Sequence, residues 1–146
     1  MSDDNDSLIV LAIDPGGTTG TCSIRWDGDP THIPHPEALI YSEQVAFDDM
    51  PRWLDDELAA IRPYLIVYER FQISPRTVQY SRQPEALYVI GGVLFAAKLA
   101  GIPVREQGAA DAKNAYPNDR IKDWKVKGPH AKDALRHALL SCHRRL

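Results

Sequence analysis

The feature that most constrains the fold is an unbroken apolar run, Leu8–Ile13, which ends at Asp14 and a Pro-Gly-Gly turn. Consecutive apolar residues, mostly branched and bounded by Pro and Gly, predict a β-strand that is buried on both faces. Asp14 therefore ends a buried strand, where a carboxylate must be solvated, paired or bound to a cation. Residues Gly20–Trp26 alternate like a second strand. The turn itself allows two interpretations, an ordinary connection between strands or a site for a metal ion or a phosphate.

The length of 146 residues predicts a single domain over residues 8–146, with residues 1–7 forming an acidic, disordered tail. No signal peptide or membrane-spanning run is recognisable in the sequence. The two cysteines, Cys22 and Cys142, are far apart and lack the spacing of zinc ligands. We therefore expect a cytoplasmic protein with reduced thiols and no contact with a membrane.

Charge is divided unevenly along the chain. Residues 1–69 contain three Lys and Arg against 14 Asp and Glu, whereas residues 70–146 contain 14 Lys and Arg against six Asp and Glu. Such a division predicts a basic face that contacts a polyanion. The alternative is that the two halves neutralise each other across the fold.

Strands and helices alternate in the rest of the chain, as in an α/β protein. Asp48 opens an amphipathic helix that Pro63 ends, and a second apolar run, residues 64–69, then ends in Glu69. A helical crossover of this length implies parallel pairing with Leu8–Ile13, which places Glu69 beside Asp14. The other expected elements are strands at Leu39–Val45 and Ile102–Glu106 and helices at Pro84–Gly101, Ala109–Tyr116 and Pro129–His143.

Two segments have open interpretations. The helix Pro84–Gly101 is apolar on nearly all sides, so one face should pack on the sheet and the other should contact a second copy of the chain or be covered by the core. Pro117–Gly128 is polar and basic around Trp124, which indicates a loop near the ligand or a mobile lid.

The last helix supplies further candidate ligands, because His130 and Asp133 are three residues apart and share one face. His137 continues this face. Asp14, Glu69 and Asp133, with His130, make an oxygen-rich set with one imidazole, which suits Mg²⁺ or Mn²⁺ better than Zn²⁺. Two such cations can promote phosphodiester hydrolysis, with Asp14 as the bridging carboxylate.

Residues 70–83 combine arginines with aromatic rings, a composition that is typical of nucleic-acid contacts, although an ordinary flexible loop has a similar composition. His32 and His35, by contrast, are expected to be solvated loop residues. The candidate DNA-binding residues are Arg70, Phe71, Arg76, Tyr80, Arg82, Lys113, Lys122, Lys125 and Lys127.

The order of motifs, a strand followed by IDPG, then VYERF, an Ala-rich helix and HAKDALRHALL, resembles the RuvC family of Holliday-junction resolvases. The resemblance implies an RNase H-like α/β fold with a mixed five-stranded sheet, ordered 3-2-1-4-5, whose first three strands form an antiparallel meander flanked by helices. It also implies that Asp14, Glu69 and Asp133 are catalytic acids that bind Mg²⁺ or Mn²⁺, with His130 as the fourth ligand. Family members act as homodimers on four-way DNA junctions, and the helix Pro84–Gly101 is the expected dimer contact.

The compact chain looks most like phage-encoded members, which would place it in the host cytoplasm. We therefore expect an endonuclease that cleaves Holliday junctions or other branched DNA in recombination, repair or phage DNA processing. Three alternatives remain: an RNA-processing nuclease of RuvC-like fold, a non-catalytic protein that binds branched DNA, and a nucleotide-binding fold of the actin and sugar-kinase type. The last needs two such domains, and this length supplies one.

Overall fold

The computed structural model describes residues 7–71 and 84–143. The strands are β1 (Leu8–Asp14), β2 (Thr18–Trp26), β3 (Leu39–Ala46), β4 (Leu65–Glu69) and β5 (Val104–Gln107). The helices are η1 (Pro36–Ala38), η2 (Phe47–Asp49), α1 (Met50–Ile61), α3 (Glu85–Ala100), α4 (Ala109–Ala115), α5 (Asn118–Ile121) and α6 (Pro129–His143).

The five strands form one sheet in the order β3-β2-β1-β4-β5. β1, β2 and β3 pair antiparallel, whereas β4 pairs in parallel with both β1 and β5. This confirms the predicted meander and the predicted parallel placement of β4 beside β1. The crossover through α1 explains the parallel pairing, because a parallel neighbour needs a connection that returns the chain to the same end of the sheet.

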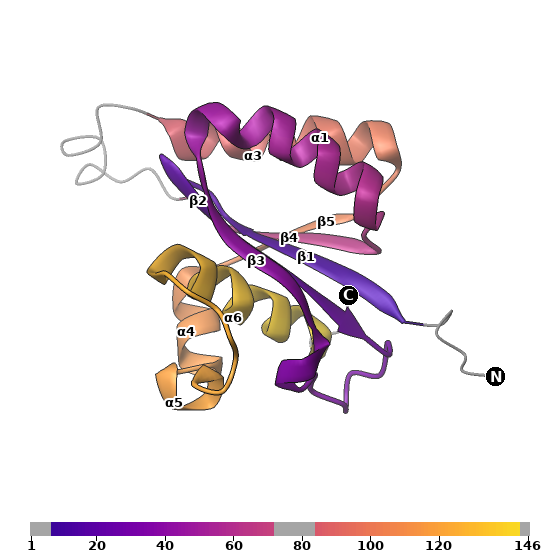
Figure 1. Ribbon diagram of the computed structural model, residues 1–146, viewed down its shortest axis with the longest axis vertical. Coiled ribbons are helices and arrows are strands. Elements are labelled where there is room, and N and C mark those ends of the chain that lie inside the picture. The colour runs from indigo at the N-terminus through magenta and orange to yellow at the C-terminus, as the bar shows by residue number, and fades with distance from the viewer. Residues whose placement is uncertain (1–6, 72–83, 144–146) are drawn as a thin grey trace.

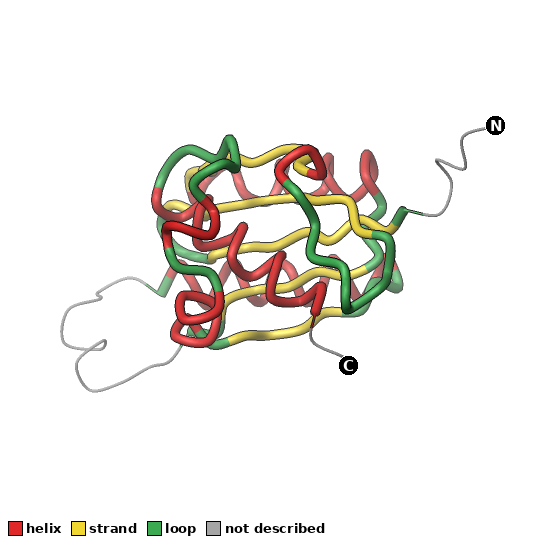
Figure 2. The backbone as a smooth tube through the Cα atoms, turned by 90° about the horizontal axis from the view of Figure 1, so that it is seen from below, coloured by secondary structure: helices red, strands yellow, loops and turns green. Residues whose placement is uncertain are grey.

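Helices cover both faces of the sheet, so the molecule has three layers (Figure 1). α1 and α3 lie on one face, and α4, α5 and α6 lie on the other (Figure 1). Figure 2 shows α6 lying across the strands, and its contacts extend over β1, β2, β3 and β4. Because β1 is central, its residues alternate between two cores: Val10 and Ala12 pack in the core under α6, and Leu11 and Ile13 pack in the core under α1 and α3.

The segment from 117 to 128 differs from its predicted character as a polar loop or mobile lid. It contains the short helix α5, and its apolar side chains Ile121, Trp124 and Val126 are buried in the core under α6. The basic residues between them point outward. Sequence periodicity does not reveal this burial, because Ile121 ends a short helix and Trp124 and Val126 lie outside any helix, so the three share no regular helix face.

No helix in residues 7–71 and 84–143 is both long enough and apolar enough to cross a bilayer.

Candidate metal centre at the strand ends

Five residues from five strands stand side by side at one end of the sheet. Asp14 is paired with Gly20, Gly20 with Gln44, and Glu69 with Gln107. Ile13 pairs with Tyr68, so the residues that follow them, Asp14 and Glu69, end neighbouring strands. We call these five residues, Gln44, Gly20, Asp14, Glu69 and Gln107, the strand-end row.

The N-terminal half of α6 lies directly against the strand-end row. The backbone N–H of His130 donates to Gln44 Oε1 at 3.0 Å. A Cβ atom on Gly20 would lie 2.0 Å from the backbone carbonyl carbon of His130, so only glycine permits this approach. Gly128, with φ of +92°, turns the chain into α6 at the same place. The helix that carries His130 and Asp133 is thus fixed close to the strand that carries Asp14.

Two histidines of α6 contact two acids of the row. His130 Nδ1 lies 3.1 Å from Asp14 Oδ2, and His137 Nε2 lies 3.1 Å from Glu69 Oε1. Asp14 is only 5% exposed, whereas the His130 side chain is about half exposed. The two contacts are made by residues seven apart on the helix, two turns along one face.

The electrostatics of the acids are unequal. Burial, a hydrogen bond with Glu69 and the negative charges of Glu69 and Asp133 raise the pKa of Asp14 to about 8, against the attraction of Lys113. Burial also acts to raise the pKa of Glu69, but hydrogen bonds with His137 and Asp14, and attraction to His137 and Lys113, lower it overall. Buried Asp14 thus disfavours its charged form, a condition that a bound cation would relieve.

Asp133 lies close enough for its charge to act on Asp14, but one of its oxygens is already engaged. Arg136 Nη1 donates to Asp133 Oδ1 at 2.7 Å. The same guanidinium donates to the backbone carbonyl of Tyr116 and to Asn118 Oδ1, and it is mostly buried. Arg136 thus connects the acid to the segment between α4 and α5.

Within residues 7–71 and 84–143, no three His, Cys, Asp or Glu side chains are arranged to hold a metal ion. Each acid instead has a nitrogen neighbour, His130 for Asp14, His137 for Glu69 and Arg136 for Asp133. The chemistry of the set nonetheless fits a hard cation, because carboxylate oxygens dominate it and its central acid is buried beside two others. The residues that could hold such a cation are the predicted set, Asp14, Glu69, Asp133 and His130.

The predicted DNA-binding residues are dispersed. Arg70 follows β4 and pairs with Glu106 at 3.1 Å, and Phe71 is half-buried. Lys113, on α4, is exposed and acts on both Asp14 and Glu69. Exposed lysines also follow α5, at Lys122, Lys125 and Lys127. The remaining candidates, Arg76, Tyr80 and Arg82, lie outside the described residues.

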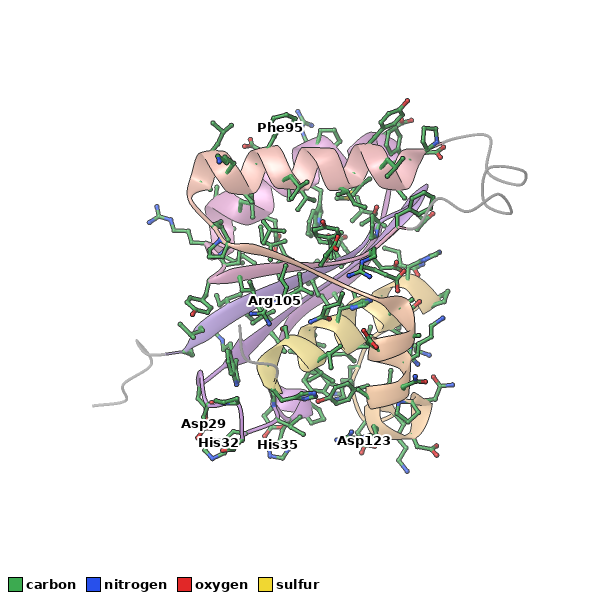
Figure 3. All side chains as sticks on the ribbon, turned by 180° about the vertical axis from the view of Figure 1, so that it is seen from behind. Asp29, His32, His35, Phe95, Arg105 and Asp123 are labelled. Atoms are coloured by element: carbon green, nitrogen blue, oxygen red, sulfur yellow. The ribbon has the colours of Figure 1, made fainter. Side chains whose placement is uncertain are left out.

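The two loop histidines are remote from the metal-site candidates. Figure 3 shows His32 and His35 at the end of the sheet where β1 begins, whereas Asp14 is where β1 ends. His32 Nδ1 lies 2.8 Å from Asp27 Oδ2 on the surface. This agrees with their predicted placement in a loop.

Sequence reasoning missed several contributors to the site, chiefly Gly20, Gln107, Arg136 and the contact of His137 with Glu69. The i, i+3 spacing of Asp133 and Arg136 was a readable signal for their ion pair. Gln107 carried no such signal, since its place beside Glu69 follows from strand register alone.

No protein-family model matches the sequence, and no curated protein sequence matches it. Among solved structures, Thermus thermophilus RuvC is 22% identical with a TM-score of 0.67, over 90% of this chain and 92% of that one. T. thermophilus RuvC bound to a Holliday junction substrate is 21% identical with a TM-score of 0.64, over 90% of each chain. Fowlpox virus resolvase, also solved with Holliday junction DNA, is 12% identical with a TM-score of 0.56, over 91% of this chain and 97% of that one. The chain therefore has the fold of T. thermophilus RuvC and of fowlpox virus resolvase.

Proposed function

We propose that this chain is a divalent-metal-dependent endonuclease that cleaves Holliday junctions and related branched DNA. The observation that carries the proposal is the convergence of Asp14 and Glu69, at adjacent parallel strand ends, with His130 and Asp133 of α6. The fold is shared with T. thermophilus RuvC and fowlpox resolvase, whose structures hold Holliday junction DNA, and this supports the choice of substrate.

The residues of the chain have separable tasks in this proposal. Asp14, Glu69, Asp133 and His130 hold Mg²⁺ or Mn²⁺, of which two per site are expected. When bound, the cations supply a nucleophilic water at neutral pH and stabilise charge on the phosphate. Lys113 supplies positive charge beside the acids, and the exposed lysines after α5 attract the DNA backbone on the same side of the sheet.

Cleavage of a labelled four-way junction, with a linear duplex and a structured RNA as competing substrates, tests the proposal. We expect metal-dependent nicks in the junction, and Asp14→Asn should lower the rate by more than about a hundredfold, beyond the usual cost of losing an outer-shell partner. Junction binding by Asp14→Asn should persist, because the change removes a negative charge that faces phosphate.

The matched control is Asp123→Asn, an exposed acid beyond α5 that Figure 3 shows at the surface, and it should cleave at the wild-type rate. Cleavage confined to RNA would favour an RNA-processing nuclease. Binding without cleavage under any metal would leave a non-catalytic junction-binding protein, and full activity of Asp14→Asn would remove the proposed site.

The active form is proposed to be a homodimer that joins through α3. This helix leaves Phe95 77% exposed and Leu99 90% exposed, and Figure 3 shows Phe95 directed away from the sheet. Tyr88, Leu87 and Leu94 extend the same apolar surface. An open groove of about 1230 Å³ between α1 and α3, lined by residues such as Leu54 and Tyr88, adjoins it. A contiguous apolar patch of this kind marks an interaction site, and a symmetric four-armed substrate suits a two-fold partner.

Light scattering after size exclusion tests the dimer. The wild-type chain should have twice the mass of one chain, and the double change Phe95→Ser with Leu99→Ser should give a folded monomer. Exposed Tyr41 on β3, changed to Ser, is the control that should remain dimeric. A wild-type chain that is monomeric at micromolar concentration, with or without junction, would contradict the proposed dimer.

A further inference from the structure

His137 is a completely buried histidine, 0% exposed, yet both of its ring nitrogens face polar side chains of the strand-end row. Nδ1 lies 2.9 Å from Gln107 Oε1, and Nε2 lies 3.1 Å from Glu69 Oε1. A buried histidine needs partners for its ring nitrogens, and here both partners belong to the row. The imidazole thus spans the ends of β4 and β5.

The register of the sheet explains why one ring reaches both partners. Glu69 and Gln107 are directly paired on neighbouring parallel strands, so their side chains leave the same face of the sheet. α6 packs on that face, and His137 is four residues beyond Asp133 and seven beyond His130. The three α6 residues therefore share one helix face along the row.

We infer that His137 is a positioning residue for Glu69, and that Gln107 in turn fixes the orientation of the imidazole. The ring Nε2–H donates to one oxygen of the Glu69 carboxylate and prevents its rotation, which leaves the other oxygen for Asp14 and the cation. Nδ1 of the neutral ring then accepts from the Gln107 amide, turned so that its Nε2–H, which has no other partner among the described residues, faces the ring. The inference rests on the proposed function, since it assigns the residues that orient one of the proposed metal ligands. Partners that orient a ligating carboxylate typically contribute a factor of about 10–100 in metal affinity or activity.

The first test measures Mn²⁺ affinity of the full chain without DNA, by electron paramagnetic resonance titration. His137→Leu fills the same space with an apolar side chain that donates no hydrogen bond. We expect this variant to bind Mn²⁺ about 10–100-fold more weakly. His137→Gln retains an N–H near the same place and should recover most of the loss. Gln107→Leu should weaken binding less than His137→Leu, because it acts only through the ring.

Leu140→Ala is the control for simple destabilisation, because Leu140 is also buried on α6, belongs to the apolar core and has no polar side-chain atom that could bond to the row. It should lower the melting temperature and leave Mn²⁺ affinity unchanged. The inference would be overturned if folded His137→Leu bound Mn²⁺ as tightly as the wild type, or if His137→Gln and His137→Leu lost equal Mn²⁺ affinity. Either result would leave the proposed nuclease intact.

A second readout does not depend on metal or DNA. In ¹⁵N-histidine spectra of the metal-free chain, Glu69→Gln should shift the His137 Nε2 resonance, and Gln107→Leu should shift Nδ1. Unchanged resonances would show that the ring does not hold these partners. A wild-type chain that neither binds Mn²⁺ nor cleaves DNA would defeat the proposed function itself, and the inference with it, whereas the His137 results alone affect only the positioning role.

Discussion

The helices α6 and α3 lie on opposite faces of the sheet, and the more polar of the two, α6, is the more deeply buried. α6 carries Arg, His and Ser, and yet ten of its residues are buried, including Arg136, His137 and Ser141. α3 is far more apolar and buries only Ala86, Val89, Val93 and Ala97. The polar helix is enclosed because its buried polar groups find partners, His137 in the strand-end row and Arg136 and Ser141 outside it. The exposed apolar face of α3 is the surface that we propose for a second copy of the chain.

Apolar content therefore does not rank these two helices by burial. A buried polar side chain is tolerated when each polar atom finds a partner, as Arg136 does with Asp133, Asn118 and the Tyr116 carbonyl. An exposed Leu or Phe costs little in the monomer but leaves apolar area in water that association can remove.

A Leu→Ala change in each helix should give the largest difference in the free energy of unfolding. Leu135→Ala on α6 removes a side chain that is 0% exposed, and should lower the free energy of unfolding by about 2–5 kcal/mol. Leu99→Ala on α3 should change the stability of the monomer by less than about 0.5 kcal/mol. Urea unfolding at low protein concentration provides both values. A large loss for Leu99→Ala that persists on dilution would mean that α3 is covered within one chain.

A smaller loss of stability is expected from a substitution where β2 contacts α6. Gly20→Ala places a methyl group against the His130 backbone and should cost about 1–3 kcal/mol, as overpacking of a rigid contact does. It should also weaken Mn²⁺ binding, because it moves α6 away from Asp14. Gly17→Ala is the matched control: a Cβ atom there has no neighbour within 4 Å. Thermal unfolding with and without Mn²⁺ separates the two variants, and equal behaviour would show that the close approach is unimportant.

The last prediction concerns the pH dependence of stability. Because burial and neighbouring charge raise the pKa of Asp14 from 3.8 to about 8, the folded metal-free chain holds a proton that the unfolded chain loses. Stability should therefore fall as the pH rises from about 4 to 8, and the fall should end above that range. Asp14→Asn should flatten this part of the profile. Melting temperatures across the range, without metal, check this, and an equally steep profile in Asp14→Asn would assign the dependence to another group.

Much of the fold could be read from the sequence, because its signals are local. The apolar run before Asp14 predicted the central strand, and the crossover length predicted the parallel strand that ends in Glu69; the structure confirms both. The face shared by His130 and Asp133 followed from helical spacing, and both residues lie at the row. These inferences needed only periodicity and chain connectivity.

What could not be read depends on register between distant elements. The contact of Gly20 with His130 requires the packing depth of α6 on β2, and the contact of Gln107 with His137 requires the alignment of β5 with β4. The burial of Trp124 and Val126 was also unreadable, since no periodic pattern surrounds them. The metal ligands, the junction-cleaving activity and the dimer stay predictions.

Anomalous diffraction from crystals soaked in Mn²⁺ would show whether the strand-end row is a metal centre. We expect a Mn²⁺ peak at the strand-end row, about 2.0–2.3 Å from oxygens of Asp14 and Glu69, as is usual for hard divalent cations. The Asp14→Asn protein should lose this peak. A well-ordered crystal with no peak beside Asp14, or with Mn²⁺ bound only elsewhere, would contradict the claim that the row is a metal centre.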